Sequence, residues 1–478
     1  MARPARAACI MLLVGLALPP LLLPPAAPAE AREVSARRAS PPRNQVQQRQ
    51  AVQRRLARQD AARRGVVIGG TAAAAMAAAA PADPPAPLQP AAWEDLPGWA
   101  DDSPIEALPP VLASCRAFAA MTPGRALGGA GEIAAAAGTP ELWRPACAAL
   151  IRAWNTLPPL PPPNRRRGRA GQARLREAQV ARNEHLRRAL EENFSPAPVG
   201  EGLLTAYYEP VLRGSLAPDE AFATPLYSKP PEHVAIDVPN SLRPAHGRLQ
   251  DGRLEPLPDR AAIQNGALAG RGLELAWVTD PAEAFFLHIQ GSGRVVLPNG
   301  AVLRLGYAGQ NGQPYRAVGR SLIERGELMR DRMSMRAIRA WMAAAGPERA
   351  NALMAENPSY IFFQRNEGLR DDQGPPGAMG IPLTPERSVA VDPAVVPLGA
   401  PVFVADADPQ PGRPAGERFR RLLAAQDTGG AIRGPGRGDL FRGWGHEAGE
   451  RAGNVREPVR MWVLLPRSAA AMLAGRDP

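Results

Sequence analysis

The sequence predicts an α+β protein in which a helical first third is followed by a mainly β remainder. Alanine- and leucine-rich segments with helical spacing recur between residues 105 and 194. From Gly202 onward, short runs rich in β-branched and aromatic residues alternate with glycine and proline. Between two such runs stands Asn299-Gly300, the strongest short-range signal for a β-hairpin. These three observations together predict the class.

The helical part is expected in three pieces. They are residues 105–121, 141–155 and 173–194, the last of which is closed by Ser195-Pro196. Residues 157–171 lie between the second and third pieces and contain a proline run followed by an arginine run. We expect this segment to be a solvated surface loop.

The mainly β part is expected to contain short strands interrupted by helices. The predicted strands are residues 203–208, 273–278, 284–290, 295–297, 302–305, 360–363, 388–391, 401–405, 420–425 and 459–465. The predicted helices are residues 316–325, 334–345 and 347–356. Ser334 is expected to cap the second helix, and Pro347 takes the first position of the third.

The chain has 478 residues and a net charge of +11, enough for two or three domains with a basic surface. Its basic residues are all arginine except Lys229. The excess of arginine over lysine indicates a bias in genomic base composition, so the positive charge is not taken as a sign of nucleic-acid binding. A basic surface would also suit binding to an anionic polymer such as a cell wall. The five scattered histidines show no zinc-ligand spacing, so no metal and no cofactor is expected.

Residues 1–82 contain two export signals in series. An apolar run near the start is followed by a second pattern, in which Arg63-Arg64 leads into an alanine-rich run. We expect this region to be removed, or to reflect a start placed too far upstream, and the mature chain to begin near Asp83. Export to the periplasm is therefore predicted. Neither run is followed by an attachment cysteine, so association with the outer membrane through the leader stays open.

Export also bears on the three cysteines. Cys9 lies in the leader, which leaves Cys115 and Cys147 in the mature chain. In an oxidising compartment these two can form one disulfide. The alternative is two buried thiols.

The stretch from Gln426 to Phe441 carries two carboxylates, Asp427 and Asp439, joined by a glycine-rich connection. Two acids held close together can have their pKa values pushed apart, so that one stays protonated near neutral pH and serves as a general acid. The alternative is that each aspartate caps a turn, because Asp beside Gly is common in turns.

Several longer segments match one known family. In chain order they include Leu204-Thr205-Ala206-Tyr207-Tyr208-Glu209-Pro210, Gln290-Gly291-Ser292-Gly293, Gly306-Tyr307-Ala308-Gly309, Asn357-Pro358-Ser359-Tyr360 and Asp427-Thr428-Gly429-Gly430. Residues 202–466 thereby resemble the membrane-bound lytic murein transglycosylase A family. The closing third resembles the 3D domain, named for three aspartates, which here are Asp392, Asp427 and Asp439.

The resemblance implies a mainly β protein of two domains with a glycan-binding groove between them. A double-psi β-barrel would be built from residues 83–212, which include the N-terminal helices, and residues 308–467, which include the 3D domain at about 380–467. An inserted β-barrel-like domain would span residues 213–307. Residues 468–478 would form a tail.

The resemblance also implies a reaction. The family cleaves the bond between N-acetylmuramic acid and N-acetylglucosamine in peptidoglycan without water, leaving a 1,6-anhydromuramyl end. By resemblance, Asp439 is the single acid/base, while Asp427 orients it or raises its pKa, and stabilises the positive charge that develops at C1. Arg437 would lower that pKa if it pointed at Asp439, so we expect it to point away. Asp392 is expected to be structural.

Eight further residues are expected to bind the glycan strand. Tyr207, Tyr208, Tyr307 and Tyr315 would stack on sugar rings or bond to their hydroxyls, and Gln290, Gly291, Ser292 and Gly293 would contact acetamido groups. The alternative for each tyrosine is core packing.

Two other functions stay open. A peptidoglycan-binding protein could keep the fold and lack the activity, because fold does not fix function. Asp427-Thr428-Gly429 is also the tripeptide of aspartic proteases, but these need a second copy, and none occurs in the sequence.

Overall fold

The computed structural model describes residues 67–68, 90–162, 168–238, 244–407 and 419–468. The chain divides into two compact units, Met1–Arg64 and Gly65–Pro478, and every described residue lies in the second. Nearly all of the expected leader, the centre of the proline–arginine loop and most of the expected tail lie outside the described residues. No helix among the described residues is both long and apolar enough to cross a membrane.

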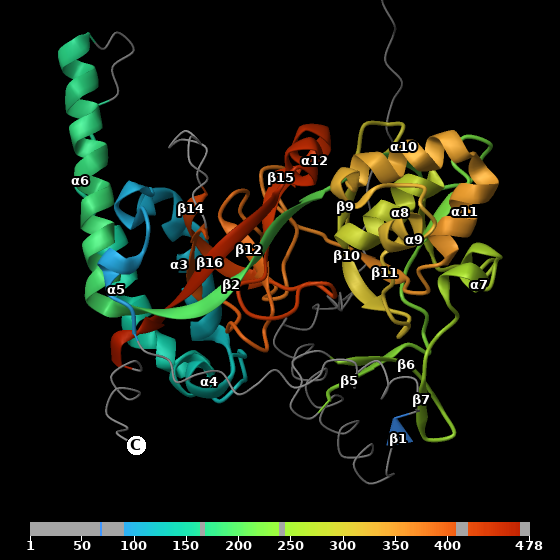
Figure 1. The fold of residues 1–478 in the computed structure, drawn as a ribbon, viewed down its shortest axis with the longest axis horizontal. Helices are drawn as coiled ribbons and strands as arrows, with labels where there is room; N and C mark the ends of the chain where they lie inside the picture. Colours follow the sequence, from blue (N-terminus) through green and yellow to red (C-terminus); the bar gives the residue numbers. More distant parts are fainter. Residues whose placement is uncertain (1–66, 69–89, 163–167, 239–243, 408–418, 469–478) are drawn as a thin grey trace, which may run out of the picture. The chain divides into compact units, whose positions relative to one another are not determined.

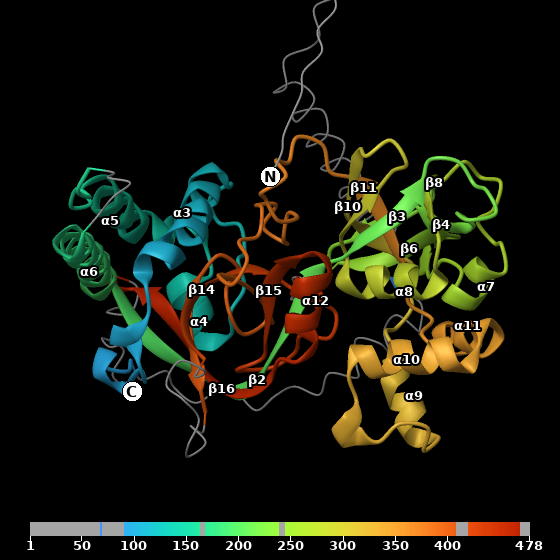
Figure 2. The ribbon, with the colours of Figure 1, turned by 90° about the horizontal axis from the view of Figure 1, so that it is seen from above.

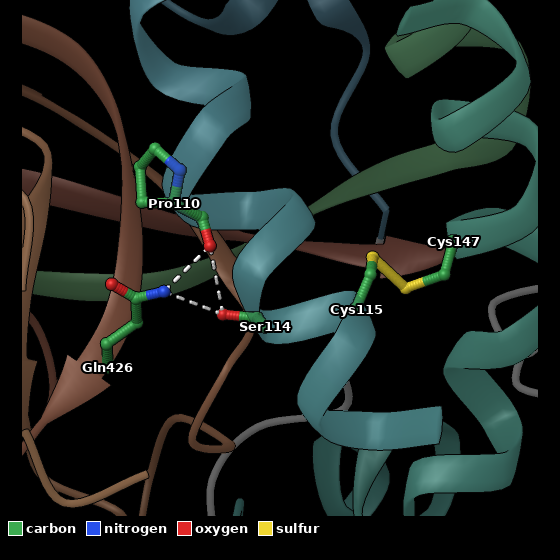
Figure 3. The surroundings of a disulfide bond; sticks show 5 residues. All are labelled: Pro110, Ser114, Cys115, Cys147 and Gln426. Atoms are coloured by element: carbon green, nitrogen blue, oxygen red, sulfur yellow. Dashed lines mark hydrogen bonds between the residues drawn. A yellow bond between two sulfur atoms is a disulfide. The ribbon is translucent and has the colours of Figure 1, made fainter. Parts of the chain in front are cut away.

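Helices dominate the first part of the described chain, as expected. These are α3 (Pro104–Ala120), α4 (Gly131–Ala137), α5 (Arg144–Asn155) and α6 (Arg169–Asn193), with short 3₁₀ turns at Trp93–Asp95, Trp99–Asp101 and Pro140–Trp143. α3 packs against α5 and α6. The predicted disulfide is present and joins Cys115 of α3 to Cys147 of α5 (Figure 3).

Six strands close into a barrel. They are β2 (Phe194–Glu209), β12 (Ser388–Val391), β13 (Pro401–Asp406), β14 (Arg420–Asp427), β15 (Gly438–Trp444) and β16 (Arg456–Pro466), in the order β12-β14-β13-β16-β2-β15. β13 is buried along its whole length, both at its apolar residues 401–405 and at Asp406. α3 lies against β14 and α4 against β16 (Figures 1 and 2).

A second sheet of six strands follows the end of β2. Its members are β3 (Val211–Ser215), β4 (Thr224–Tyr227), β8 (Glu274–Val278), β9 (Gly293–Val296), β10 (Val302–Gln310) and β11 (Ile361–Arg365), in the order β11-β10-β9-β3-β8-β4. An isolated bridge between Ser228 and Phe363 joins its two edges, which makes the sheet barrel-like. A smaller sheet contains β1 (Val67–Ile68), β5 (Val234–Ile236), β6 (Ala245–Gln250) and β7 (Arg253–Glu255).

The remaining helices are α7 (Arg260–Gln264), α8 (Pro281–Gln290), α9 (Val318–Glu324), α10 (Met335–Ala345), α11 (Pro347–Ala355) and α12 (Gly445–Gly453). Ser334 caps α10 as expected, since its side chain accepts a hydrogen bond from the Ala337 amide. The Asn299-Gly300 hairpin is also confirmed, because β9 and β10 pair antiparallel with Val296 opposite Val302.

The strand predicted at residues 284–290 is wrong, because this segment belongs to helix α8. The Asp280 side chain caps the helix by accepting from the Ala282 amide, Pro281 takes the first helical position, and Gly291 ends it in the left-handed conformation. The apolar run at Phe285 and Phe286 is buried, so it carries no amphipathic period. A short buried helix and a buried strand cannot be told apart by periodicity alone.

Candidate active site

One short strand, β12, brings the two predicted catalytic aspartates to the same level of the barrel. Ala390 of β12 stands opposite Asp439 of β15 on one side and opposite Asp427 of β14 on the other. Neighbouring strands lie about 5 Å apart, so two strands that flank a third are separated by about 10 Å at the backbone. The barrel therefore supplies the proximity that the sequence spacing only suggested.

Asp439 is held by a residue of β2. Asp439 pairs with Thr205 in the parallel β15–β2 ladder, and the Thr205 hydroxyl donates to Asp439 Oδ1 at 2.5 Å. Burial raises the pKa of Asp439 from its ordinary value of 3.8 to about 6, against the opposing effects of the Thr205 hydrogen bond and the Arg437 charge. The negative charge of Asp427 adds to the increase. Asp439 is therefore a carboxyl group that exchanges its proton near neutral pH.

The expectation that Arg437 points away is wrong. Its Nη2 donates to Thr205 Oγ1 at 2.9 Å, and its Nη1 donates to the carbonyls of Leu203 and Gly438. Its positive charge therefore acts on Asp439 and lowers that pKa. Burial is the larger effect, so the pKa of Asp439 remains above its ordinary value.

Asp427 is held in a different way, by two donors. Tyr207 Oη donates to its Oδ2 at 2.7 Å, and the Ala378 amide donates to its Oδ1 at 3.0 Å. Burial raises the pKa of Asp427, while these hydrogen bonds oppose the increase by stabilising the ionised form. Burial and the Asp427 charge also raise the pKa of Tyr207 well above its ordinary value, so the phenol stays neutral and donates.

The loop that supplies the Ala378 amide packs directly on the end of β14. A Cβ added to Gly377 would lie 2.6 Å from the Gln426 carbonyl oxygen and 2.7 Å from Leu383 Cδ2. Only glycine allows this close approach. The backbone around Gly377 thus brings the Ala378 N–H to Asp427.

Asp392, the third aspartate, ties down the connection between the other two. It is 7% exposed, and its Oδ2 accepts from the Gly434 amide at 2.8 Å. Its Oδ1 accepts from the Ala394 amide at 3.2 Å. These contacts fit the structural role predicted for it.

Pro435-Gly436, in the same connection, lies on β2. Gly436 has φ +65°, and a Cβ there would lie 2.4 Å from the Glu201 carbonyl carbon. The connection is therefore fixed at both of these points, one on Asp392 and one on β2, before it enters β15.

The segment Gln290-Gly291-Ser292-Gly293 forms a link between α8, β9 and the end of β2. Gln290 Oε1 accepts from the Tyr208 amide at 3.0 Å, Gly291 ends α8, and Gly293 begins β9. The Tyr208 ring is 8% exposed and packs on α12, where a Cβ at Gly449 would lie 2.8 Å from it. Tyr208 therefore packs on α12, and its contact with a sugar stays a prediction.

The other predicted tyrosines divide into a buried one and two exposed ones. Tyr207 is 9% exposed and packs on Phe441 with ring centroids 5.4 Å apart. Tyr307 and Tyr315 are each 46% exposed. Tyr307 lies on β10 and its hydroxyl is 3.3 Å from His246 Nε2. Only Tyr207 is thus shown in contact with the aspartate pair.

Two groups that hold the aspartates, Thr205 and the Ala378 amide, were not predicted from the sequence. Thr205 was detectable, because it stands two residues before Tyr207 on a strand and alternate residues share a face. The Ala378 amide has no sequence signal, since any residue supplies an N–H. Within the described parts of the chain, no group of three or more His, Cys, Asp or Glu side chains could hold a metal ion.

Comparison with known proteins identifies two matching families. Residues 203–364 match the family described as the MltA specific insert domain, and residues 387–465 match the 3D domain. The membrane-bound lytic murein transglycosylase A of Vibrio cholerae is 34% identical over 270 residues, which cover 55% of this chain and 66% of that protein. The chain thus spans just under two thirds of this curated relative.

Solved structures agree with these matches. A membrane-bound lytic murein transglycosylase from Agrobacterium tumefaciens is 34% identical with a TM-score of 0.65, over 81% of this chain and 99% of that one. The structure of Escherichia coli MltA with bound chitohexaose is 27% identical with a TM-score of 0.50, over 70% of this chain and 87% of that one.

Proposed function

The chain belongs to the membrane-bound lytic murein transglycosylase A family, and from this premise we propose that it cleaves peptidoglycan glycan strands without water. The bond broken joins N-acetylmuramic acid to N-acetylglucosamine, and the product carries a 1,6-anhydromuramyl end. The chitohexaose bound to the E. coli relative supports a glycan strand as the ligand.

The observation that carries this proposal is the state of Asp439. Its pKa of about 6 means that it is protonated in a useful fraction of molecules near neutral pH and also loses its proton readily. A hydrolase that retains or inverts needs a second carboxylate free to act as nucleophile or base, whereas both oxygens of Asp427 already accept hydrogen bonds, from Tyr207 and from the Ala378 amide. A transglycosylase needs one group that acts twice, and Asp439 has the pKa for both steps.

The two steps balance in protons. Protonated Asp439 first donates its proton to the glycosidic oxygen as the bond to C1 breaks and N-acetylglucosamine leaves. Asp439, now a carboxylate, then accepts the proton of the C6 hydroxyl as that oxygen bonds to C1. Both reacting groups belong to the same muramyl residue, so positioning supplies much of the rate enhancement.

We propose that Asp427 is the charged partner in this reaction. The hydrogen bonds from Tyr207 and the Ala378 amide favour its ionised form. An ionised Asp427 raises the pKa of Asp439 and stabilises the positive charge that develops at C1. Tyr207 then acts as a positioning residue through Asp427 rather than as a stacking platform.

Tyr307 and Tyr315 remain in the proposal as sugar-contacting residues, because their rings are exposed. We also propose that the glycan strand lies in a groove between the barrel and the inserted sheet, and that the domains have the boundaries predicted from the sequence. The proposed location of the protein is the periplasm. The Cys115–Cys147 disulfide supports export, since such bonds persist in oxidising compartments.

Digestion of purified sacculi tests the proposed reaction. The exported protein should release anhydromuropeptides, detected by mass spectrometry, and no label should enter the new sugar end in isotope-labelled water. Label at that end would indicate a hydrolase, and strand binding without any product would indicate the non-catalytic binding protein.

Two substitutions assign the roles. Asp439→Asn should lower the rate by at least the roughly 10²- to 10⁴-fold that a general acid/base contributes, with glycan binding retained. Asp427→Asn should also slow turnover, because the charge near C1 is lost. Retained activity in Asp439→Asn would place the acid/base elsewhere, and a near-normal rate in Asp427→Asn would leave that residue a structural one.

A further inference from the structure

The chain's one lysine lies in a cluster of polar side chains on the inserted sheet. Arginine takes every other Lys or Arg position, yet Lys229 lies close enough to His233 and His246, two of the five histidines, for its charge to lower the pKa of both. A Cβ built on Gly309 would lie 3.4 Å from Lys229 Cδ and 2.9 Å from the His233 ring. The lysine stem and the histidine ring therefore flank the same glycine of β10.

A chain of hydrogen bonds runs from His233 to Tyr307. His233 Nε2 lies 3.1 Å from the Gln310 carbonyl oxygen, which can only accept, so this nitrogen carries the hydrogen. The same nitrogen lies 3.2 Å from His246 Nδ1, which must then be the acceptor. His246 therefore carries its hydrogen on Nε2 and donates it to Tyr307 Oη at 3.3 Å.

Both imidazoles are neutral at neutral pH, as this assignment requires. Burial, His233 and Lys229 together lower the pKa of His246 to about 4. Burial and the Lys229 charge likewise lower the pKa of His233. Each ring therefore has one donor and one acceptor nitrogen, and the chain of bonds has a fixed direction.

Because the hydrogen bonds run from His233 to Tyr307, the two exposed residues of the cluster, Tyr307 and Lys229, are left to act as donors through their hydroxyl and ammonium groups. Tyr307 is 46% exposed and its Oη accepts from His246, so the phenol hydrogen is available to an outside group. Lys229 is exposed, and no described carboxylate forms an ion pair with its ammonium group. The nearby Glu232 pairs instead with Arg271 at 2.8 Å.

We propose that Lys229 and Tyr307, the latter oriented by His246, form a subsite for a carboxylate group of the muramyl residues in the glycan strand. An ammonium and a phenol hydroxyl are suited to bind an anionic oxygen, and charge-assisted hydrogen bonds are the stronger kind. This inference rests on the proposed function, because it takes its ligand from the same polymer. The anionic oxygens of that polymer are the carboxylates of the stem peptides and, where the stem has been removed, of the lactyl group.

Three ligands test the subsite in the Asp439→Asn background, where strands are not cleaved. Chitohexaose has no carboxylate, amidase-treated glycan oligomers have free lactyl carboxylates, and untreated oligomers have stem-peptide carboxylates. Lys229→Met and Tyr307→Phe should each weaken binding of the carboxylate-bearing oligomers about three- to tenfold at low salt. Lys229→Met should leave chitohexaose affinity unchanged, and Lys229→Arg should restore most of the loss.

Arg253→Met is the matched control, since it removes one exposed positive charge from β7 of the same inserted part. A loss with untreated oligomers alone assigns the site to stem carboxylates, and a loss with amidase-treated oligomers alone assigns it to lactyl carboxylates. Equal effects of Lys229→Met on all three ligands, or the same loss in Arg253→Met, would overturn the subsite. Failure of all three ligands to bind the Asp439→Asn protein would instead count against the proposed function.

Discussion

At the scale of single residues, the pKa of Asp439 is a balance between burial and two stabilising neighbours. Burial raises the pKa, whereas the Thr205 hydroxyl and the Arg437 charge lower it. The reaction starts from protonated Asp439, so activity should fall as pH rises through about 6. Arg437 therefore moves the alkaline limb of the pH profile to lower pH.

Replacing Arg437 should move that limb in the opposite direction. Arg437→Gln keeps a donor for Thr205 and removes the charge, so the pKa of Asp439 rises and activity persists to higher pH. The measurement is turnover of glycan oligomers against pH. Arg433→Gln, in the same connection, removes an equal charge that does not act on Asp439 and should leave the profile in place. A limb unmoved in Arg437→Gln would show that its charge is screened.

The raised pKa of Asp439 also has a cost in stability. The folded state binds this proton more tightly than the unfolded state does, so stability is lost as pH rises from 3.8 to about 6 and the loss is complete above that range. Asp439→Asn should therefore stabilise the protein at pH 7, by at most about 3 kcal/mol for a difference of about two pKa units. Denaturant unfolding at pH 7 and pH 4 should show the gain only at pH 7. An equal gain at both values would indicate a packing effect.

The sequence predicted the aspartate pair but not the orientation of its neighbours. Asp427 and Asp439 were detectable because both stand in one glycine-rich stretch. The orientation of Arg437 was predicted wrongly because it depends on the parallel pairing of β15 with β2, more than two hundred residues away in sequence. Local sequence carries no information about which distant strand will lie beside a given residue.

At the scale of elements, the disulfide fixes α3 against α5 close to the site. Cys115 and Cys147 are separated by 32 residues, and both are buried. Just before Cys115 in α3, the Pro110 carbonyl and the Ser114 hydroxyl accept hydrogen bonds from Gln426 Nε2 (Figure 3), and Gln426 directly precedes Asp427. α3 therefore holds the end of β14 in place through the Gln426 side chain.

Loss of the disulfide should destabilise this part of the chain. Closing a loop of this length stabilises a fold by about 3–4 kcal/mol in the chain-entropy account. The Cys115→Ala/Cys147→Ala variant should lose a comparable free energy of unfolding in denaturant titrations without reductant. The unmodified protein should show the same loss when reduced, and the variant should be insensitive to reductant. Mass mapping that found two free thiols in exported protein would contradict the bond.

Some helices and strands were predicted correctly from the sequence, whereas helix α8 was not. The three N-terminal helices and the Asn299-Gly300 hairpin follow local rules, so their prediction succeeded. The α8 segment was assigned to a strand because its apolar run outweighed its end signals, Asp280-Pro281 and Gly291. Weighing those caps would have corrected the assignment, since they mark a helix start and a helix end.

At the scale of the whole described unit, a buried ionic cluster joins the barrel to the inserted sheet. Glu209 ends β2, is 1% exposed, and binds Arg294 at 2.8 Å and Arg304 at 3.1 Å. Arg294 also lies over the Trp444 ring at the end of β15, 4.1 Å from its centroid. Both arginines donate to backbone carbonyls of the returning segment at residues 370–373. Glu209 and its two arginines thus hold together the two chain segments that connect the barrel with the inserted sheet.

Glu209→Gln should therefore destabilise the unit by about 3–5 kcal/mol, because two buried guanidinium groups would lose their counter-charge. Denaturant unfolding followed by tryptophan fluorescence measures the loss. The matched control is Glu255→Gln, which removes an exposed partner 3.8 Å from Arg248 and should cost less than about 1 kcal/mol. If the cluster also holds the sheets together, Glu209→Gln should split one unfolding transition into two. Equal small losses in the two variants would show that the carbonyls at residues 370–373 suffice to hold the arginines.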